Sequence, residues 1–477
     1  MESSAAIRPE TGEYDRLVTY ARERPDPVPE EVVQRVWYDQ LFPSESLQTS
    51  EGMPVRVISP GWWNDAEGPD FLGAQIQFGG TVRTGDVEVH LDHQGWRQHG
   101  HHRDPRYDNV ILEVVLATKA PASPSTTVSG RKVACLLLAD RLDTDLGQVI
   151  QSAFADDYPH AVSMTEGYCA ALSRKHGADH VRRFLLLAGE WRLLQKSRTL
   201  AERAARAGMD QAVYEGFLTA CGYSRYKNHF ASVARGLPYE RVRQLAREDP
   251  MLVETAFLQV GGLLPQALPD ETAIPHFRRL AELRARHLDG LRSLPLAWSR
   301  TGVRPNNYPE RRLSGAARFL ARTARNGLPA TLDAIWREAC SPLERRRAFE
   351  ALFPSAMGFW AEHCTWTGKR LPTPNAPLGA SRIRSIIGNV FLPAGLASAR
   401  SRSDREMEER VLELFAALPK ETGNHVVRIM IPRIFGDLKP PRIDFRTQQG
   451  LLQVFQDWCE PNPSCRNCPV ISYLDSP

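Results

Sequence analysis

The amino-acid sequence predicts an α+β/α protein: an α/β domain with one helix and a mixed four-stranded sheet, then a mainly helical domain and a C-terminal segment with clustered cysteines. Short β-type runs bounded by Gly and Pro fill the first part of the chain, long segments with helical periodicity fill the middle, and three Cys crowd the end. The expected boundaries are 1–27 for a mobile lead-in, 28–145 for the α/β domain, 146–430 for the helical domain and 431–477 for the cysteine segment.

Each element of the α/β domain follows from a local pattern. The first 27 residues are polar and contain Pro, so they have little to bury. Hydrophobic side chains at helical spacing, with acids in the first turn, predict a helix over 30–42. Strands are expected at 54–58, 73–78, 81–91 and 109–117, and the last is the near-continuous apolar run of a buried strand.

The helical domain shows periodic segments separated by Gly and Pro. Helices are expected at 180–204, 272–291, 315–325 and 406–418. A final helix at 448–458 would bring its C-terminal end to the cysteines. No fixed-period repeat is present in the sequence, which excludes a solenoid.

Composition limits the classes of protein that the chain can belong to. Its 477 residues are 42% hydrophobic and 24% charged, which excludes disordered and collagen-like chains. No apolar stretch reaches the roughly 18 residues of a membrane span, and the polar start lacks a leader pattern. We therefore expect a cytoplasmic protein without a membrane partner, and no feature predicts its oligomeric state. The net charge of +4 permits a nucleic-acid partner without requiring one.

An acidic group in the first domain is the strongest chemical signal. Asp70 precedes one expected strand, and Glu88 and His90 lie two residues apart in the next. Residues two apart on a strand share a face, so both side chains can point at one object near Asp70. Two carboxylates with a neutral imidazole predict a site for a hard divalent cation, which lowers the pKa of bound water and binds a phosphoryl oxygen.

These residues resemble a known layout. A helix with an acid, Gly-Pro-Asp before the second strand and Glu-x-Lys in the third strand characterise the PD-(D/E)XK nuclease-like superfamily. The resemblance implies that Asp70 and Glu88 bind Mg²⁺ or Mn²⁺, that Glu30 or Glu31 completes the site, and that the protein hydrolyses phosphodiesters of nucleic acid.

His90 departs from this layout, because the superfamily has Lys at its position. The chain holds 52 Arg and 8 Lys, and its first Lys is Lys119. Two alternatives therefore stay open. One is a non-catalytic nucleic-acid-binding or scaffolding protein with a degraded nuclease site. The other is a His-rich metalloenzyme acting on a small substrate.

Over most of its length the chain is similar to the bacterial family called domain of unknown function 2851. The similar stretches are VWYDQLF, PGWWNDAEGPDFLGAQI, GDVEVHLDHQGWRQHGHHRDPRYDNVILEVV, RPNNYPERR, GNVFLPAGLA and QGLLQVFQDWCEPNPSCRNCP. The resemblance implies no activity, because the family's name records none.

Five of the 13 His lie between positions 90 and 102. One interpretation is that His99 or His102, with Asp104, adds a metal ligand or a general base beside Glu88. The alternative is a hydrogen-bonded polar connection anchored by aromatic side chains. The additional candidates for the site are Glu30, Glu31, Glu67, His99, His102, Asp104, Tyr107 and Glu113.

The C-terminal cysteines form a second signal. Cys459-x5-Cys465-x2-Cys468 places three thiols within one short segment, and the Cys-x2-Cys half is typical of a shared metal or cluster. An iron–sulfur cluster and Zn²⁺ are both compatible with this spacing, and three reduced thiols are the alternative. The family resemblance favours Cys169 as the fourth ligand.

Ten Arg lie between positions 301 and 347. Several recur at helical spacing, and Arg guanidinium groups suit phosphate, which predicts a nucleic-acid-binding stripe. The alternative is a solvated helix face in a chain that uses Arg in place of Lys throughout. The candidate stripe comprises Arg304, Arg311, Arg318, Arg322 and Arg325.

Overall fold

A computed structural model describes residues 14, 18, 30–40, 42, 47–64, 67–117, 125–138, 167–265, 273–301, 303–421, 424–460, 465 and 468–475, without the side chains of 31, 32, 35, 39 and 224. The chain forms two compact units. The sheet unit comprises Ala21–Ala155 with Pro295–Ala297, and the helical unit comprises Met1–Tyr20, Asp156–Leu294 and Trp298–Pro477.

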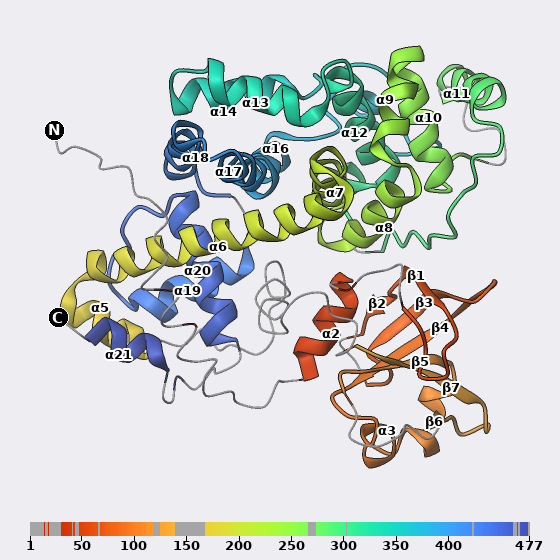
Figure 1. Ribbon diagram of the computed structural model, residues 1–477, viewed down its shortest axis with the longest axis horizontal. Helices are drawn as coiled ribbons and strands as arrows, with labels where there is room; N and C mark the ends of the chain where they lie inside the picture. Colours follow the sequence, from red (N-terminus) through yellow and green to blue (C-terminus); the bar gives the residue numbers. More distant parts are fainter. Residues whose placement is uncertain are drawn as a thin grey trace. The chain divides into compact units, whose positions relative to one another are not determined.

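Among its described residues, the sheet unit contains the helix α2, a mixed sheet and three short helical turns (Figure 1). Its elements are α2 (Glu30–Asp39), β1 (Val55–Ser59), β2 (Trp62–Trp63), β3 (Phe71–Phe78), β4 (Thr81–His90), α3 (Gly95–Gln98), η1 (His101–Arg103), η2 (Pro105–Tyr107), β5 (Val110–Val115), β6 (Ser125–Thr126) and β7 (Lys132–Leu137).

The sheet has the order β1-β3-β4-β5-β7-β6, and β2 pairs with β3. β1, β3 and β4 are antiparallel neighbours, whereas β4, β5 and β7 run parallel. The predicted mixed sheet is confirmed, but four strands is wrong, because the described residues form seven. The strands β2 and β6 have two residues each and carry no periodic signature. A short and mostly apolar run such as β7 does not distinguish a strand from a helix.

The two faces of β4 differ in chemistry, as its alternating sequence predicts. Val87 and Val89 belong to the hydrophobic core of the unit, together with Val33 and Trp37 of α2. Trp37 Nε1 also donates to the carbonyl of Pro60 at 3.0 Å, which fixes α2 over this face. The other face of β4 therefore carries its polar residues away from the core.

The described part of the helical unit is interrupted by non-helical stretches at 288–301 and 363–379 and otherwise consists mostly of helices. They are α5 (Tyr168–His176), α6 (Ala178–Ala207), α7 (Met209–Cys221), α8 (Tyr223–Gly236), α9 (Tyr239–Glu248), α10 (Pro250–Val260), α11 (Ile274–His287), η5 (Pro305–Asn307), α12 (Pro309–Thr323), α13 (Leu328–Glu338), α14 (Pro342–Ala351), α15 (Phe359–Glu362), α16 (Ala380–Ile386), η6 (Ile387–Phe391), α17 (Leu392–Ser401), α18 (Arg405–Ala417), α19 (His425–Phe435), α20 (Phe445–Val454), η7 (Phe455–Cys459) and α21 (Pro469–Asp475).

The predicted order of a mixed sheet followed by a mostly helical region is confirmed. In the part of the chain that the structure describes, no helix has both the length and the apolar character that crossing a bilayer requires.

Helix α6, with 30 residues, is a long helix of the helical unit, and α20 packs closely against it (Figure 1). This contact depends on two glycines, because a Cβ at Gly189 would meet the Arg446 carbonyl and a Cβ at Gly450 would meet the Leu185 carbonyl. Arg446 and Glu190 form a buried ion pair beside this contact. The C-terminal helices thus belong to the same core as α6.

The expectation of a lead-in with little to bury does not hold at Tyr14 and Val18. Both are buried, with exposed fractions of 1% and 5%. The Tyr14 hydroxyl donates to Asp457 at 2.7 Å and accepts from Trp458 Nε1 at 3.1 Å. An aromatic side chain near the start of the chain therefore packs against its C-terminal part.

Candidate functional site

Asp70 and Glu88 meet at the junction of β3 and β4, as the sequence predicted. The Asp70 N–H donates to Glu88 Oε2 at 3.1 Å, and Asp70 Oδ2 accepts from the Val89 N–H at 2.9 Å. Gln34 of α2 donates to Asp70 Oδ1 at 2.8 Å. These contacts fix both carboxyl groups side by side.

Burial shifts the pKa of both carboxyl groups. Burial, together with the charge of Glu88, raises the pKa of Asp70 to about 8. Burial raises the pKa of Glu88 to about 8 as well, and the Glu30 carboxylate adds to both shifts. Two coupled carboxyl groups that resist ionisation together are suited to a cation, which removes their repulsion.

Two buried imidazoles converge on Glu88. His101 Nε2 lies 3.0 Å from Glu88 Oε1, and His90 Nε2 lies 3.8 Å from the same oxygen. In the described part of the chain neither nitrogen has a partner with hydrogen-bond geometry. Buried polar nitrogens are normally satisfied, so these two with the Glu88 oxygen form a donor set that fits a metal ion.

Glu113 orients His90 from the neighbouring strand. Glu113 is opposite Glu88 in the parallel β4–β5 pair and is fully buried. Its Oε1 lies 3.0 Å from His90 Nδ1, and its Oε2 accepts from Ser125 at 2.7 Å. A carboxylate on one imidazole nitrogen is the arrangement that directs the other nitrogen to a metal. The candidate Glu113 is thus a positioning residue.

The charges around these imidazoles act in opposite directions. Burial alone would lower the pKa of His90, but Glu113 and Glu88 raise it above its usual range. Burial and the charge of His90 lower the pKa of His101 to about 4. His101 is therefore neutral at physiological pH, which leaves it free to act as a ligand.

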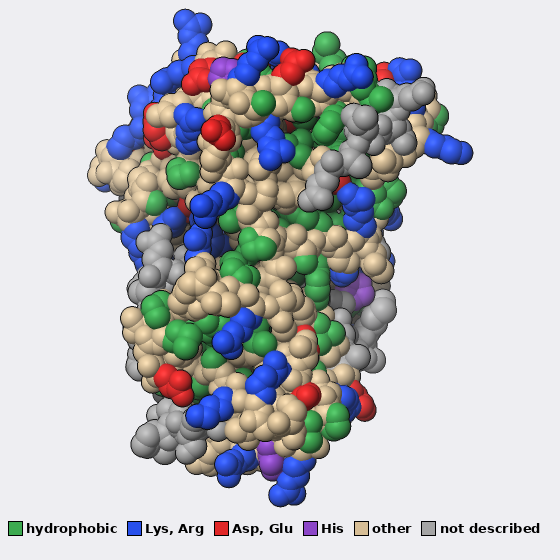
Figure 2. Space-filling model, turned by 90° about the vertical axis from the view of Figure 1, so that its right-hand side faces the viewer, with side chains coloured by type: hydrophobic (Ala, Val, Ile, Leu, Met, Phe, Trp, Pro, Cys, Tyr) green, Lys and Arg blue, Asp and Glu red, His purple; other side chains and the backbone are tan. Residues whose placement is uncertain are grey.

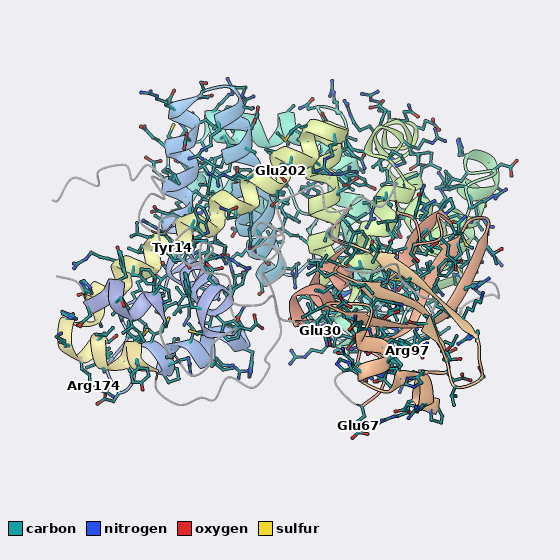
Figure 3. All side chains as sticks on the ribbon, turned by 60° about the horizontal axis from the view of Figure 1, so that its bottom comes forward. Tyr14, Glu30, Glu67, Arg97, Arg174 and Glu202 are labelled. Carbon is teal, nitrogen blue, oxygen red and sulfur yellow. The ribbon has the colours of Figure 1, made fainter. Side chains whose placement is uncertain are left out.

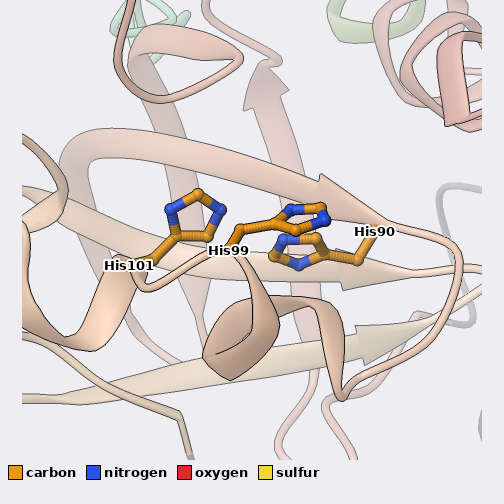
Figure 4. Close-up of side chains that lie close together, drawn as sticks. All are labelled: His90, His99 and His101. Atoms are coloured by element: carbon orange, nitrogen blue, oxygen red, sulfur yellow. The ribbon is translucent and has the colours of Figure 1, made fainter.

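His99 completes a group of three imidazoles. The ligand atoms of His90, His99 and His101 all lie within 4.8 Å of one another. Figure 4 shows the three rings together, with those of His90 and His99 close to each other. His99 is exposed whereas His90 and His101 are buried, so His99 lies at the solvent side of the group.

A second group lies next to the first. The ligand atoms of His93, Glu113 and Cys135 are also within 4.8 Å of one another. His93 Nδ1 lies 3.1 Å from Glu113 Oε2. Burial and the charge of Glu113 raise the pKa of the Cys135 thiol to about 12. Glu113 therefore belongs to the second group and contacts His90 of the first.

Short turns after β4 hold the imidazoles in place. Tyr107 stacks on His101 with ring centroids 3.8 Å apart, and its hydroxyl donates to the Gly68 carbonyl at 3.2 Å. A Cβ at Gly95 would meet the His90 ring at 2.5 Å. Only glycine at this position allows α3 to lie directly against His90. The candidate Tyr107 is thus a packing and positioning residue.

A family comparison applies to the chain that carries this site. The family model described as "Protein of unknown function (DUF2851)" matches residues 30–424. The chain belongs to this family. The DUF2851 match contains all of the carboxylates and imidazoles described above, and it ends before Cys459. No curated protein and no solved structure matches the chain.

Several predicted residues of this DUF2851 protein lie outside the group. Glu67 is exposed and pairs with Arg106, and Asp104 caps the turn η2 and binds the same Arg106. Figure 3 shows Glu67 at the outer edge of the sheet unit and Glu30 on α2. The Nδ1 of His102 is buried and has no hydrogen-bond partner in the described part of the chain. The side chain of Glu31 lies outside the described residues.

The sequence did not select His101 and His93 among the five clustered His, although both contact site carboxylates. Gly100 is the feature of the sequence that could have indicated His101. Its φ of 80° turns the chain just before η1, whose first residue, His101, is buried. No pattern in the sequence selects His93.

The predicted arginine stripe is not one exposed face. Arg311 is fully buried and donates to the Trp360 carbonyl at 2.9 Å and to the Asn375 carbonyl at 2.8 Å. Arg322 donates to the Phe353 carbonyl at 3.1 Å, and Arg318 donates to the Met357 carbonyl. Arg304 and Arg325 are exposed.

On the face drawn in Figure 2, Lys and Arg side chains are interspersed with acidic and hydrophobic ones. This distribution differs from a continuous basic stripe.

The four candidate cysteines of the helical unit come together. Cys169, Cys459, Cys465 and Cys468 all line one cavity. Burial raises the pKa of Cys459 to about 12, against the opposing charge of Arg433. The structure thus brings Cys169 to the terminal trio, as the family resemblance favoured.

Proposed function

We propose that this protein is a divalent-metal-dependent hydrolase that cleaves phosphodiester bonds in nucleic acid, with its site at Asp70, Glu88 and His90. The observation that carries the proposal is the convergence of two unsatisfied buried imidazole nitrogens, from His90 and His101, on the Glu88 carboxylate. A protein interior tolerates such a set when a cation satisfies it.

The donor set favours Mn²⁺ over Mg²⁺. Carboxylates suit both ions, but imidazole nitrogen suits transition metals. Glu88, His90 and His101 would hold the ion, with Asp70 available just before the neighbouring strand β3. When bound, the ion supplies an activated water and binds a phosphoryl oxygen. Glu113 keeps the Nε2 of His90 directed at this position.

The order of elements around the site supports the nuclease part of the proposal. Helix α2 carries Glu30, Asp70 directly precedes β3, and Glu88-Val-His90 ends β4, which then pairs in parallel with β5. His90 replaces the superfamily's lysine. Its Nδ1 lies 3.0 Å from Glu113 Oε1, so its Nε2 would bind the ion and take over a ligand's role at this position.

A second candidate function is a His-rich metalloenzyme for a small substrate. It is favoured by the depth of the donor set, since Glu88, His90 and His101 have exposed fractions of 5%, 0% and 6%. A small molecule reaches such a set more easily than a duplex does. The two functions differ in substrate and share the metal.

The full chain, loaded with Mn²⁺, Mg²⁺ or Zn²⁺, tests the proposal on plasmid, single-stranded DNA and RNA. We expect cleavage with Mn²⁺, its loss in Glu88→Gln, and unchanged cleavage in Glu51→Gln, which alters an exposed carboxylate of the same unit. His101→Ala should weaken Mn²⁺ binding by at least about 10-fold, the scale of perturbed metal shells, and His102→Ala should weaken it less.

Three outcomes contradict parts of the proposal. Cleavage that survives Glu88→Gln with Asp70→Asn would reject the site. Metal binding without cleavage of any nucleic acid would favour the small-substrate enzyme. Activity that appears only in His90→Lys would show a degraded site in a non-catalytic protein.

A further inference from the structure

Four cysteines from distant parts of the chain line one cavity in the helical unit, far in sequence from the proposed hydrolytic site. Cys169 lies in the first turn of α5, and Cys459 ends η7. Cys465 and Cys468 come just before α21. The cavity that these residues share is also lined by Gly167, Arg433, Ile434, Val454, Trp458, Val470 and Ile471.

The surroundings of the thiols are apolar. Apart from the cysteines and Arg433, the lining consists of hydrophobic side chains and Gly167. Cys169, Cys459 and Cys465 are buried, with exposed fractions of 8%, 8% and 9%. No disulfide joins the four sulfur atoms in the described structure. Four convergent, unbridged thiols in an apolar shell form the environment of a thiolate-bound metal centre.

We propose that Cys169, Cys459, Cys465 and Cys468 bind an iron–sulfur cluster. The spread of the sulfur atoms favours a cluster over a single zinc ion. In a tetrahedral zinc site with Zn–S bonds of about 2.3 Å, the sulfur atoms lie roughly 3.8 Å apart. Among the described residues, the sets of ligand atoms that all fall within 4.8 Å of one another are in the sheet unit and do not include these sulfurs.

Arg433 supplies a positive charge for the centre. It is 3% exposed, and its Nη2 donates to Cys465 Sγ at 3.1 Å. It also hydrogen-bonds to the Cys459 thiol. A buried cation needs a negative partner. When four thiols lose their protons to solvent and bond to iron, the resulting anionic cluster provides one. Hydrogen bonds to the sulfurs also tune the reduction potential of such a cluster.

The backbone around the cavity adopts two uncommon conformations. Cys459 ends a π-helical turn, a form that recurs at functional sites. Cys465 has a φ of 58°, the left-handed region that residues other than Gly rarely adopt. The Gly167 N–H donates to the Arg433 carbonyl at 2.9 Å, and a Cβ at Gly167 would meet that oxygen at 3.0 Å. These features aim residues from three segments at the same cavity.

Elemental analysis of the full chain, expressed and purified without oxygen, tests the proposal. We expect iron and acid-labile sulfide in equal amounts, a brown colour, and visible absorbance that bleaches on reduction. Each of Cys169→Ser, Cys459→Ser and Cys468→Ser should lose most of the iron. Cys221→Ser, which alters a buried thiol of α7 that does not line the cavity, should retain it.

The reduction potential of the cluster gives a second test, which uses variants that keep their iron. In Arg433→Gln the iron should remain and the reduction potential should become more negative, because a positive charge next to the cluster is removed. Arg433→Lys should lie nearer to the wild type. Stoichiometric zinc without sulfide would overturn the proposal. So would a protein that stays metal-free after anaerobic incubation with iron and sulfide.

Discussion

At the scale of single residues, Glu88 combines properties that conflict in the absence of a cation. It is almost fully buried and accepts a hydrogen bond from the Asp70 N–H, and imidazole nitrogens of His90 and His101 lie 3.8 and 3.0 Å from its Oε1. Each contact restricts where its carboxylate points, and none removes the repulsion from Asp70. The residue therefore links the chemistry of the site to the stability of the sheet unit.

The raised pKa values of Asp70 and Glu88, about 8 each, predict a pH dependence of stability. The unfolded chain releases these protons near pH 4, so between about pH 5 and pH 8 the folded protein binds more protons than the unfolded chain. Without metal, the free energy of unfolding should fall as pH rises through this window. Denaturant titrations at several pH values, with a chelator, measure it.

The same protons compete with the metal. Added Mn²⁺ should stabilise the protein more at pH 8 than at pH 5, because the pKa values of Asp70 and Glu88 are about 8 and protons occupy both carboxyl groups at the lower pH. Glu88→Gln should flatten both dependences. A metal-free stability that rises across this window would contradict the coupling of the two carboxyl groups.

The sequence predicted this part of the site well because a strand has a period of two. Once β4 is assigned, Glu88 and His90 must share a face, and Asp70 follows from the adjacent strand. The choice among the clustered His could not be made in the same way. Short helical turns with a left-handed glycine, Gly100, have no period, so the inward direction of His101 is set by tertiary packing.

At the scale of elements, helices and strands with a periodic sequence pattern were predicted, whereas those without one were not. Helix α2 and the strands β1, β3, β4 and β5 have strong local patterns, and they appear where expected. Strand β7 has no strong local pattern, and its six residues form a strand because they pair with β5. The helices α6 and α18 are near their predicted bounds, whereas α12 begins earlier, at Pro309, a residue suited to a first helical turn.

The contact between α3 and His90 predicts the effect of one methyl group. Gly95→Ala would place a Cβ against the His90 ring, so either α3 or the imidazole must shift. We expect weaker Mn²⁺ binding by about 10-fold or more, comparable with the loss of a supporting contact. Isothermal titration calorimetry measures it. Gly100→Ala is unsuitable as a control because its φ is positive, whereas Gly80→Ala meets nothing within 4 Å.

Unchanged Mn²⁺ affinity in Gly95→Ala, with Gly80→Ala equal to the wild type, would show that His90 is not a ligand. Loss of affinity in both variants would indicate a general effect on the sheet unit.

At the scale of the whole molecule, the sheet unit is formed by residues 21–155 with the short segment 295–297, whereas the helical unit takes residues from both sides of the first of these ranges. Tyr14 is the clearest sign of this arrangement, through its contacts with Asp457 and Trp458. The periodicity of local segments carries no information about such a pairing, since the partners are 443 and 444 residues apart.

Tyr14→Ala should destabilise the helical unit. Removing a large buried aromatic side chain costs about 3–5 kcal/mol, and here the hydroxyl contacts are lost as well. Denaturant unfolding followed by circular dichroism measures the change. Met357→Ala, at a side chain that is 69% exposed, should alter stability by less than about 0.5 kcal/mol. Equal effects of the two variants would contradict the packing of Tyr14.

The position of Tyr14 also fixes an order of events during synthesis. The ribosome makes Tyr14 long before its hydrogen-bond partners, Asp457 and Trp458, which follow 443 and 444 residues later. Most of the sheet unit is translated in between. Tyr14 therefore cannot reach its native contacts until both partners have emerged, and this part of the helical unit can close only then.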